Sequence, residues 1–274
     1  MILGLQVIMI KTVICHFYNE EYLLPLWLKH HCKIFDNGIM IDYNSTDRSV
    51  EIIRDLCPTW QIVQSRNDKF DAYECDREVE DYEGIIKDWR IALNVTEFIY
   101  GNFDRLNDRN EDQQIILSNY IFADMEDTAK GSGVLDSNMP IHKQRYWGYH
   151  QRDDVGRNRP GHSVRRQHRS IHNFPINYAD HPGRHFPEMP ATYDDLVIFY
   201  YGYADASYSG LIRKAQIQTK MSQFDINRNS GGHVATPGDF LNRIRVDHQP
   251  KSRDLRSEFD YIIKHNERTT RQEW

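Results

Sequence analysis

The chain has 274 residues, of which 39% are hydrophobic and 12% aromatic, and its formal net charge is −6. The aromatic content excludes an intrinsically disordered chain, and the length suits one substantial core, so we expect a single domain over 1–274. The apolar opening, 1–10, is too short to span a bilayer and lacks a basic leader. We therefore expect a soluble, cytoplasmic protein without a transmembrane segment.

Two apolar runs that each stop at a cluster of polar residues are the most informative feature of the sequence. The first ends in residues 16–21 and the second in residues 41–47. Between them, apolar residues recur at helical spacing from Leu23 to Ile34, which predicts strand, helix and strand. In open parallel sheets, ligands bind outside the carboxyl ends of the strands. We expect both strand ends to form one binding site.

The first hundred residues continue this alternation. Residues 62–64 predict a short strand, 72–84 a helix and 89–99 a fourth, mostly apolar strand. Alternating strands and helices predict an α/β fold with a central, mostly parallel sheet flanked by helices. Further along the chain we expect strands at 115–122 and 196–201 and helices at 211–224 and 253–265.

Residues 142–190 are rich in Arg, His, Pro and Gly and show little periodicity. We expect an irregular loop, and a structureless segment of this length in a compact domain is usually functional. A basic loop in an acidic chain suggests an anionic ligand. A solvated basic loop is the alternative, just as a solvated helix is the alternative for the acidic segment 68–88.

The four cysteines are Cys15, Cys32, Cys57 and Cys75. Their spacing lacks the close pairs of a zinc site, and their number is too low for a disulfide framework. We expect buried thiols in a reducing compartment.

The succession of motifs resembles the family-2-like glycosyltransferases with the GT-A fold. The matching motifs are Asn19-Glu20-Glu21, Asp42-x-Asn44-Ser45-Thr46-Asp47, Asp88-Trp89 and Glu97-Phe98, each in its family position relative to the predicted strands. The resemblance covers residues 12–100 well and the remainder loosely. It implies a single GT-A, Rossmann-like domain with a nucleotide-binding half at 1–100 and an acceptor and diphosphate half at 101–274.

The resemblance also implies where the nucleotide binds. The residues that match the family's nucleotide site are His16, Phe17, Asn19, Glu20, Asp42 and Asn44. A carboxylate such as Asp42 suits ribose hydroxyls, and an apolar slot suits a base. An N-cap is a compatible alternative for residues 45–47. The implied donor is a nucleotide-diphosphate sugar, with UDP favoured over GDP, and the implied acceptor is a glycan or another hydroxyl compound.

The fourth predicted strand departs from the family pattern. The family carries Asp-x-Asp there to hold a divalent metal, whereas this chain has Asn94 and Thr96, followed by Glu97. Neutral side chains weaken Mn²⁺ or Mg²⁺ binding because a hard cation prefers carboxylate oxygen. Three readings stay open: Glu97 holds the metal with phosphate oxygens, and His185 as a further ligand; basic side chains replace the metal; or activity is lost.

Glycosyl transfer needs positive charge near the leaving diphosphate and, for inversion, a carboxylate base. Arg165, Arg169 and Arg184 are the candidates for the diphosphate, because the guanidinium fork suits phosphate. Asp127 is the preferred base and Glu126 the second candidate, although a solvated loop is the alternative for both. A retaining reaction requires no such base.

Other classes lack their motifs. The chain has no His-Glu-x-x-His, no Gly-x-x-x-x-Gly-Lys loop and no Gly-x-Gly-x-x-Gly after the first strand, which argues against zincins, P-loop ATPases and dinucleotide-binding dehydrogenases. Its acidic charge, without a recognised module, argues against a nucleic-acid partner. A non-catalytic nucleotide-sugar or glycan-binding protein on the same fold is the alternative, because the acidic pair is absent.

Overall fold

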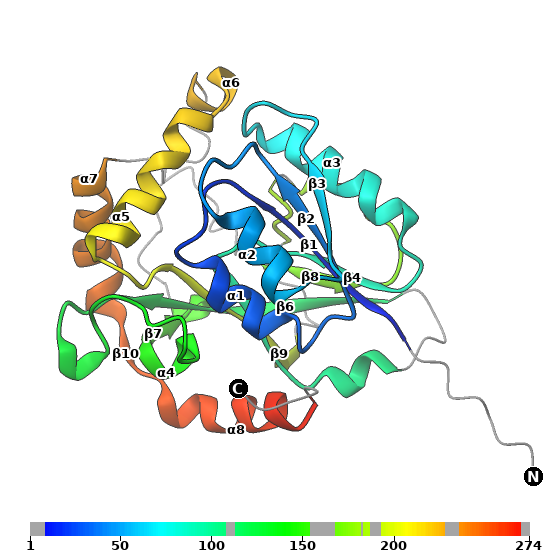
Figure 1. The fold of residues 1–274 in the computed structure, drawn as a ribbon. Helices are drawn as coiled ribbons and strands as arrows, with labels where there is room; N and C mark the ends of the chain where they lie inside the picture. Colours follow the sequence, from blue (N-terminus) through cyan, green and yellow to red (C-terminus); the bar gives the residue numbers. More distant parts are fainter. Residues whose placement is uncertain are drawn as a thin grey trace, which may run out of the picture.

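A computed structural model describes residues 9–107, 113–153, 168–181, 183–186, 193–227 and 236–269. This part of the chain is a mixed α/β structure in which helices pack on a central sheet (Figure 1). The N-terminal strands run parallel, and mainly antiparallel strands of the second half extend the sheet. The predicted α/β fold, with a central, mostly parallel sheet flanked by helices, is confirmed.

The parallel part of the sheet has the strand order β3–β2–β1–β4. Its strands are β1 (Lys11–Phe17), β2 (Asn37–Asp42), β3 (Gln61–Gln64) and β4 (Trp89–Ala92). Side chains of β1 alternate between two buried clusters, with Val13 and Cys15 in one and Ile14 in the other. Burial on both faces is typical of a parallel sheet that helices cover on each side.

Three helices connect these strands: α1 (Leu24–His31), α2 (Ser49–Leu56) and α3 (Ala72–Ile85). Trp27 of α1 and Ile53 of α2 belong to the cluster of Val13. Val79 of α3 belongs to the cluster of Ile14. The helices α1 and α2 therefore share one face of the sheet, and α3 covers the other (Figure 1).

The fourth strand predicted at 89–99 is wrong, because this segment contains two strands. β4 ends at Ala92, and β5 (Glu97–Gly101) follows a turn at 93–96. In this turn the Glu97 N–H donates to the Asn94 carbonyl (2.9 Å), and the Asn94 N–H donates to Glu97 Oε2 (2.7 Å). β5 then pairs antiparallel with β9 (Tyr193–Tyr203) rather than continuing beside β1. The turn is hidden in the sequence because both strands are buried and apolar.

The second half adds strands in the order β10–β7–β6–β8–β4, all antiparallel to their neighbours, while β9 pairs parallel with β6. Their bounds are β6 (Gln114–Ala123), β7 (Trp147–His150), β8 (Ser170–His172) and β10 (Arg253–Asp254). β6 and β9 contain the strands predicted at 115–122 and 196–201. β7 and β8 correct the expected irregularity of 142–190 in its described part, since backbone pairing with β6 orders both segments.

The remaining helices are α4 (Ile141–Gln144), α5 (Tyr208–Ala215), α6 (Gln223–Asn227), α7 (Pro237–Arg243) and α8 (Arg256–Thr269). Short turns of helix are η1 (Phe103–Asn107), η2 (Thr128–Lys130), η3 (Gln151–Asp153), η5 (Tyr178–Asp180), η6 (Gln216–Lys220), η7 (Ile244–His248) and η8 (Gln249–Lys251). None of the helices within the described ranges has the length and apolarity needed to cross a bilayer.

Two helix predictions need correction at their ends. The helix expected at 211–224 is the series α5, η6 and α6, and Thr219 Oγ1 donates to the Gln216 carbonyl (2.9 Å) where the α-helical pattern is lost. The helix expected at 253–265 begins at Arg256, because residues 253 and 254 pair with β7 and Asp254 Oδ1 accepts the Arg256 N–H (3.0 Å).

Candidate functional site

The ends of β1 and β2 lie side by side, as predicted. Phe17 pairs in register with Asp42, and the Tyr43 N–H donates to the Phe17 carbonyl (3.0 Å). Beyond this point Asn19 and Asn44 take left-handed φ values of 50° and 60°, which Asn tolerates better than most residues. Both loops therefore turn sharply at the sheet edge. We define residues 16–20 and 42–47 as the strand-end site.

Side chains fasten these two loops to each other. The Asn19 N–H donates to Ser45 Oγ (3.1 Å), and the Thr46 N–H donates to Asn19 Oδ1 (2.7 Å). The Glu20 N–H donates to Ser49 Oγ (2.8 Å) at the start of α2. Asp47 Oδ1 accepts the Ser49 N–H (2.9 Å), which agrees with the helix-start alternative for residues 45–47. The loops thus hold one defined geometry through bonds within the first half of the chain.

Asp42 has an unused carboxylate oxygen. Its Oδ1 accepts the Ser45 N–H (2.9 Å), and no residue in the described ranges donates to Oδ2. The residue is only 8% exposed. A nearly buried carboxylate at a strand end, with one oxygen available, can accept hydrogen bonds from ligand hydroxyls. This position suits the predicted ribose contact, which stays a prediction.

An aromatic group lies next to the strand-end site. The Tyr43 ring stacks on Phe70 with centroids 4.2 Å apart, and His16 meets Tyr43 edge-on at 5.9 Å. Tyr43 is fully buried, whereas Phe70 is half-buried. The group therefore presents an apolar surface near polar loops, which is a common setting for a planar ligand.

Arg184 reaches the strand-end site from the second half of the chain. It is 4% exposed and donates to Asp76 Oδ1 (2.6 Å) and to His16 Nε2 (3.3 Å). Its φ of 58° is strained for a residue with a side chain, and such strain is common at functional sites. Its Nε has no hydrogen-bond partner among the residues that the structure describes. A buried cation with an unused donor suits an anionic ligand.

Burial shifts the pKa values of His16 and Asp76, the two side chains that Arg184 contacts. Burial, and then the charges of Arg184 and Arg169, lower the pKa of His16 well below its usual value. His16 is therefore neutral at pH 7, and its Nε2 accepts the hydrogen bond from Arg184. Burial also raises the pKa of Asp76, although the pairing with Arg184 opposes that shift. The desolvation of this carboxyl therefore outweighs its ion pair.

Arg169 and Glu97 form a second buried ion pair. Arg169 Nε lies 2.9 and 3.0 Å from the two Glu97 oxygens, and the side chains are 2% and 5% exposed. Arg169 Nη1 also donates to the carbonyls of Gly183 (2.6 Å) and Arg184 (3.1 Å). Arg169 thus holds the backbone that carries Arg184. Four predicted residues, His16, Glu97, Arg169 and Arg184, form one connected group.

Glu97, the carboxylate predicted to hold a metal, already has hydrogen-bond partners on both oxygens. Both Glu97 oxygens accept hydrogen bonds from Arg169, and one also accepts the Asn94 N–H. Asn94 and Thr96 supply no charge, and His185 is half-buried beside Arg184. Within the described part of the chain, no three His, Cys, Asp or Glu side chains are grouped to hold a metal. The metal role of Glu97 and His185 stays a prediction, and the local positive charge comes from arginine.

Arg213 of α5 is a site residue that the sequence did not reveal. Its Nη1 donates to both oxygens of Glu20, at 2.8 and 2.9 Å, and both side chains are 8% exposed. Gln216 Nε2 also donates to the Asn19 carbonyl (2.6 Å). The signal in the sequence is the basic residues Arg213, Lys214 and Lys220 in the helix predicted at 211–224. It could not identify a carboxylate 193 residues away as the partner.

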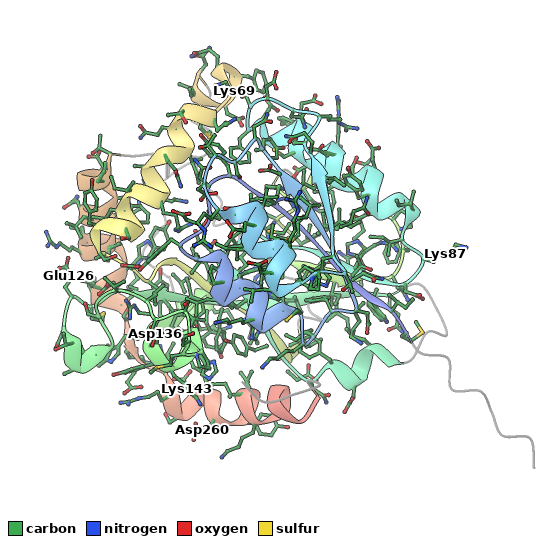
Figure 2. All side chains as sticks on the ribbon, in the orientation of Figure 1. Lys69, Lys87, Glu126, Asp136, Lys143 and Asp260 are labelled. Carbon is green, nitrogen blue, oxygen red and sulfur yellow. The ribbon has the colours of Figure 1, made fainter. Side chains whose placement is uncertain are left out.

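The segment after α5 also contacts the loop that follows β3. The Phe70 N–H donates to the Lys220 carbonyl (2.7 Å), and the Ser222 N–H donates to the Phe70 carbonyl (2.8 Å). Lys69, labelled near the end of α6 in Figure 2, donates from Nζ to the Thr219 carbonyl (2.7 Å). Residues 213–222 therefore join the strand-end site to the aromatic group.

The predicted bases lie after β6 and have local partners. Asp127 Oδ1 accepts the Ala129 N–H (3.0 Å) and caps η2, and Oδ2 lies 3.6 Å from Lys130 Nζ. Glu126 pairs with Arg245 (2.9 Å), and Figure 2 shows it at the edge of the molecule. No hydrogen bond or ion pair found in the described ranges links either residue to the strand-end site. Their catalytic roles stay predictions.

Arg165, the third predicted diphosphate ligand, lies outside the described residues. The predicted site residues that the structure does describe therefore fall into two sets. One surrounds the strand-end site, and the other consists of Glu126 and Asp127.

Comparison with known proteins gives a partial structural likeness. No family model matches the chain, and no curated protein matches it. Among solved structures it is similar to S. aureus TarS 1–349, with 16% identity and a TM-score of 0.32 over 47% of this chain and 39% of that chain. TarS 1–349 in complex with UDP-GlcNAc gives 17% identity and a TM-score of 0.31 over 47% and 37%.

A further TarS structure gives 18% identity and a TM-score of 0.25 over 33% of this chain and 17% of that chain. The matched region thus spans well under half of each TarS chain. A likeness of this extent carries no argument about activity.

Proposed function

We propose that this protein binds a nucleotide-diphosphate sugar at the strand-end site and transfers the sugar to a glycan or another hydroxyl acceptor. The observation that carries the proposal is Arg184, a buried cation with an unused Nε donor that contacts His16 beside the strand ends. The motifs that resemble GT-A glycosyltransferases assign the nucleotide to these same residues. A diphosphate is the part of the ligand that such a cation would bind.

The nucleoside and the diphosphate would use different parts of the site. Asp42 Oδ2 would accept the ribose hydroxyls, and the aromatic group of Tyr43 and Phe70 would lie near the base. Arg184, positioned by Arg169, would neutralise the diphosphate. UDP is favoured over GDP as the nucleotide. We propose no nucleic-acid partner.

In the transfer step the bond between the anomeric carbon and the diphosphate breaks as the acceptor oxygen attacks. Positive charge at the departing oxygens lowers the barrier because that charge is in place before the reaction. Asp127 would take the proton of the acceptor hydroxyl in an inverting reaction, with Glu126 as the second candidate. Mn²⁺ or Mg²⁺ would not be needed if the arginines supply all of this charge.

A second candidate function is non-catalytic binding of a nucleotide sugar or a glycan. The observation in its favour is the pairing of Glu97 with Arg169, together with the neutral Asn94 and Thr96. These residues leave no carboxylate cluster where the resembling family holds its metal. Binding at the strand-end site would survive this change, whereas transfer depends on the arginines.

Thermal unfolding with a nucleotide panel tests the proposal. Uridine, UMP, UDP and GDP are each added with Mn²⁺, with Mg²⁺ or with EDTA. A ligand at a hundred times its dissociation constant adds about 2.7 kcal/mol, which should raise Tm by several degrees in a chain of this size. We expect UDP to give the largest shift, with and without metal. If no nucleotide changes Tm, the proposal is wrong.

Two substitutions separate the parts of the site. Asp42→Asn keeps the acceptor for the Ser45 N–H but loses the negative charge, and we expect it to remove the shifts with uridine and UDP alike. Arg184→Lys should weaken the binding of UDP much more than that of uridine. The substitution removes the guanidinium fork proposed to bind the diphosphate, and uridine has no diphosphate. Asp55→Asn, on the exposed face of α2, is the matched control.

Asp127→Ala tests the base. We expect the UDP shift to persist while transfer from UDP-sugars to a panel of glycan acceptors disappears. Loss of UDP binding in this variant would contradict the role of Asp127 as base. If the parent protein binds UDP but transfers no sugar to any acceptor, the binding function is the better description.

A further inference from the structure

Trp147 of β7 differs from the other tryptophans in the described ranges, because part of its ring stays accessible. Trp27, Trp60 and Trp89 are buried, at 0%, 7% and 0% exposure, whereas Trp147 is half-buried. Figure 1 shows β7 and β10 at one edge of the sheet, where they pair with each other. Core packing explains Tyr149 of the same strand, which is fully buried. It does not account for the accessible ring of Trp147.

The turn η2 is fixed against the start of β7. The Tyr146 hydroxyl donates to the Ala129 carbonyl (3.0 Å). Gly131 ends the turn with a φ of 78°, and a Cβ at this position would lie 2.3 Å from the Gln144 carbonyl oxygen. A residue with a side chain could not take this place without moving the backbone. The position of η2 relative to β7 is therefore well defined.

Lys130 of η2 connects Trp147 with Asp127, the proposed base. Its Nζ lies 4.9 Å from the centre of the Trp147 ring and 3.6 Å from Asp127 Oδ2. The side chains of Lys130 and Asp127 are 38% and 46% exposed, so a ligand from solvent can reach both. An accessible aromatic ring, an ammonium donor and a carboxylate acceptor thus lie next to one another. We define Trp147, Lys130 and Asp127 as the β7 surface.

The segments on both sides of η2 are attached to the surroundings of the strand-end site. After η2, the Leu135 N–H donates to the Tyr22 hydroxyl oxygen (3.1 Å), and Tyr22 follows the strand-end site by two residues. Before η2, Asp124 Oδ2 accepts the Ala206 N–H (2.9 Å) in the segment that leads into α5. α5 carries Arg213, which pairs with the strand-end site. The fold therefore connects the β7 surface to the proposed donor site.

The charges beside Trp147 are balanced. Lys130 pairs with Asp127, and Arg256 Nε lies 3.0 Å from both oxygens of Asp254, the residue that pairs in register with Trp147. Both cations have a carboxylate partner, which disfavours an anionic ligand. A neutral sugar ring suits this surface better, because its C–H groups form an apolar face and its hydroxyls are hydrogen-bond donors and acceptors.

We propose that the β7 surface is the acceptor subsite and that the acceptor is a neutral glycan whose terminal pyranose ring stacks on Trp147. The flexible side chain of Lys130 moves its ammonium from the aromatic ring to hydroxyls of this sugar. Asp127 accepts a hydrogen bond from the hydroxyl that is to be glycosylated. Tyr146 positions η2 without touching the sugar. The role as acceptor subsite rests on the proposed function, whereas the binding of the glycan does not.

Saturation-transfer NMR on the full chain tests the proposal, with maltotetraose, cellotetraose and chitotetraose as probes and without any nucleotide. We expect at least one tetrasaccharide to receive saturation on the C–H protons of its terminal ring. Trp147→Ala should weaken its binding by about tenfold, and Trp147→Phe, which keeps an aromatic face, should recover part of this loss. Tyr261→Ala removes the exposed ring of α8 and is the matched control.

The proposal is wrong if none of the three tetrasaccharides binds, or if Trp147→Ala binds them as tightly as the parent. Thermal unfolding with UDP separates this result from a failure of the donor site, and the UDP shift should be the same in Trp147→Ala and in the parent. A chain that UDP stabilises but that binds no tetrasaccharide would overturn the acceptor subsite alone. Tetrasaccharide binding through Trp147 without any UDP shift would support glycan binding at the β7 surface and overturn the proposed transfer.

Discussion

The two halves of the chain bring opposite charges to the same site. Among the described residues, three buried pairs of a carboxylate and an arginine join them, with the carboxylates before residue 100 and the arginines after residue 168. The pairs are Glu97 with Arg169, Asp76 with Arg184 and Glu20 with Arg213. The two strand-end loops, in contrast, are held to each other by hydrogen bonds within the first half. The geometry of the loops is therefore local in sequence, while the cationic side of the site is assembled from a distance.

The pKa values of two of these carboxylates indicate how much the ion pairs contribute to stability. Burial raises the pKa of Glu20 and of Asp76 more than the paired arginine lowers it. A buried ion pair of this kind adds little net stability, but the loss of one partner leaves an uncompensated buried charge. The pairs therefore fix which segments meet, rather than how strongly the whole chain is folded.

The largest effect should come from a broken pair at the junction of the halves. In Arg169→Met, Glu97 stays buried without a counter-charge and the carbonyls of Gly183 and Arg184 lose their donor. We expect the free energy of unfolding, from urea denaturation at pH 7, to fall by about 3–5 kcal/mol. Arg77→Met, which breaks the exposed pair with Glu74, is the control and should cost about 0–1 kcal/mol. Equal losses of unfolding free energy in both variants would show that the buried pair between the halves matters no more than an exposed pair.

A double-mutant cycle on Glu20 and Arg213 should give the next largest effect. Each single change to Met leaves its partner buried and unpaired, whereas the double change leaves two apolar side chains of similar length. We expect the double variant to recover a large part of the single losses, with an interaction energy of roughly 1–3 kcal/mol from urea denaturation. Strictly additive losses would show that the pair does not join the two halves.

Two histidines that contact Tyr100, the buried His30 and the half-buried His142, should make the protein sensitive to acid. Burial lowers the pKa of His30 to about 3 and that of His142 to about 4, and both rings contact Tyr100. In the unfolded chain a histidine titrates near pH 6.5, so the unfolded state binds more protons below that pH. Stability should be complete above pH 6.5 and should fall by about 1.4 kcal/mol per pH unit for each histidine as the pH drops.

Urea denaturation between pH 7 and pH 4.5 measures this slope. His30→Gln, in the first half, and His142→Gln, in the second, should each reduce it by about one proton. If only one variant changes the pH dependence of the unfolding free energy, the two histidines are not equally shielded from water beside Tyr100.

The smallest effect should come from a helix cap. Ser207 accepts the Gly210 N–H (3.3 Å) at the start of α5, so Ser207→Ala should cost about 1 kcal/mol. Asp71 caps α3 in the first half but also accepts from Ser222 Oγ (3.0 Å) of the second. Asp71→Ala should therefore cost more in the same denaturation assay. A larger loss of stability in Ser207→Ala than in Asp71→Ala would argue against the contact between Asp71 and Ser222.

The α/β class and the juxtaposed strand ends could be predicted, because both follow from local patterns. An apolar run that stops at Asn19 or at Asp42 marks a buried strand and its end regardless of what packs against it. The register that brings Phe17 beside Asp42 then follows from parallel pairing. Arg169 and Arg184 could be named only because the sequence resembles a family with a diphosphate ligand.

The partners of those arginines could not be predicted, because pairing across the chain leaves no periodic signal. The acidic segment 68–88 suits a solvated helix equally well, yet Asp76, Glu78 and Glu83 of this segment are buried. Each has a partner distant in sequence or in a neighbouring loop, such as Arg184 for Asp76 and the Ser65 hydroxyl for Glu78 (2.7 Å). The turn at 93–96 was hidden for a related reason, since burial makes both flanking strands look alike.

Arg213 is the last of the three paired arginines in the sequence, and this position has a consequence for biosynthesis. The chain emerges from the ribosome starting with its first half, so Glu20, Asp76 and Glu97 are made long before their arginines. Until residue 213 has emerged, these acids must stay hydrated, and the strand-end loops cannot take up their final surroundings. A nascent chain arrested before that point should be an acidic, incomplete intermediate that no nucleotide would stabilise.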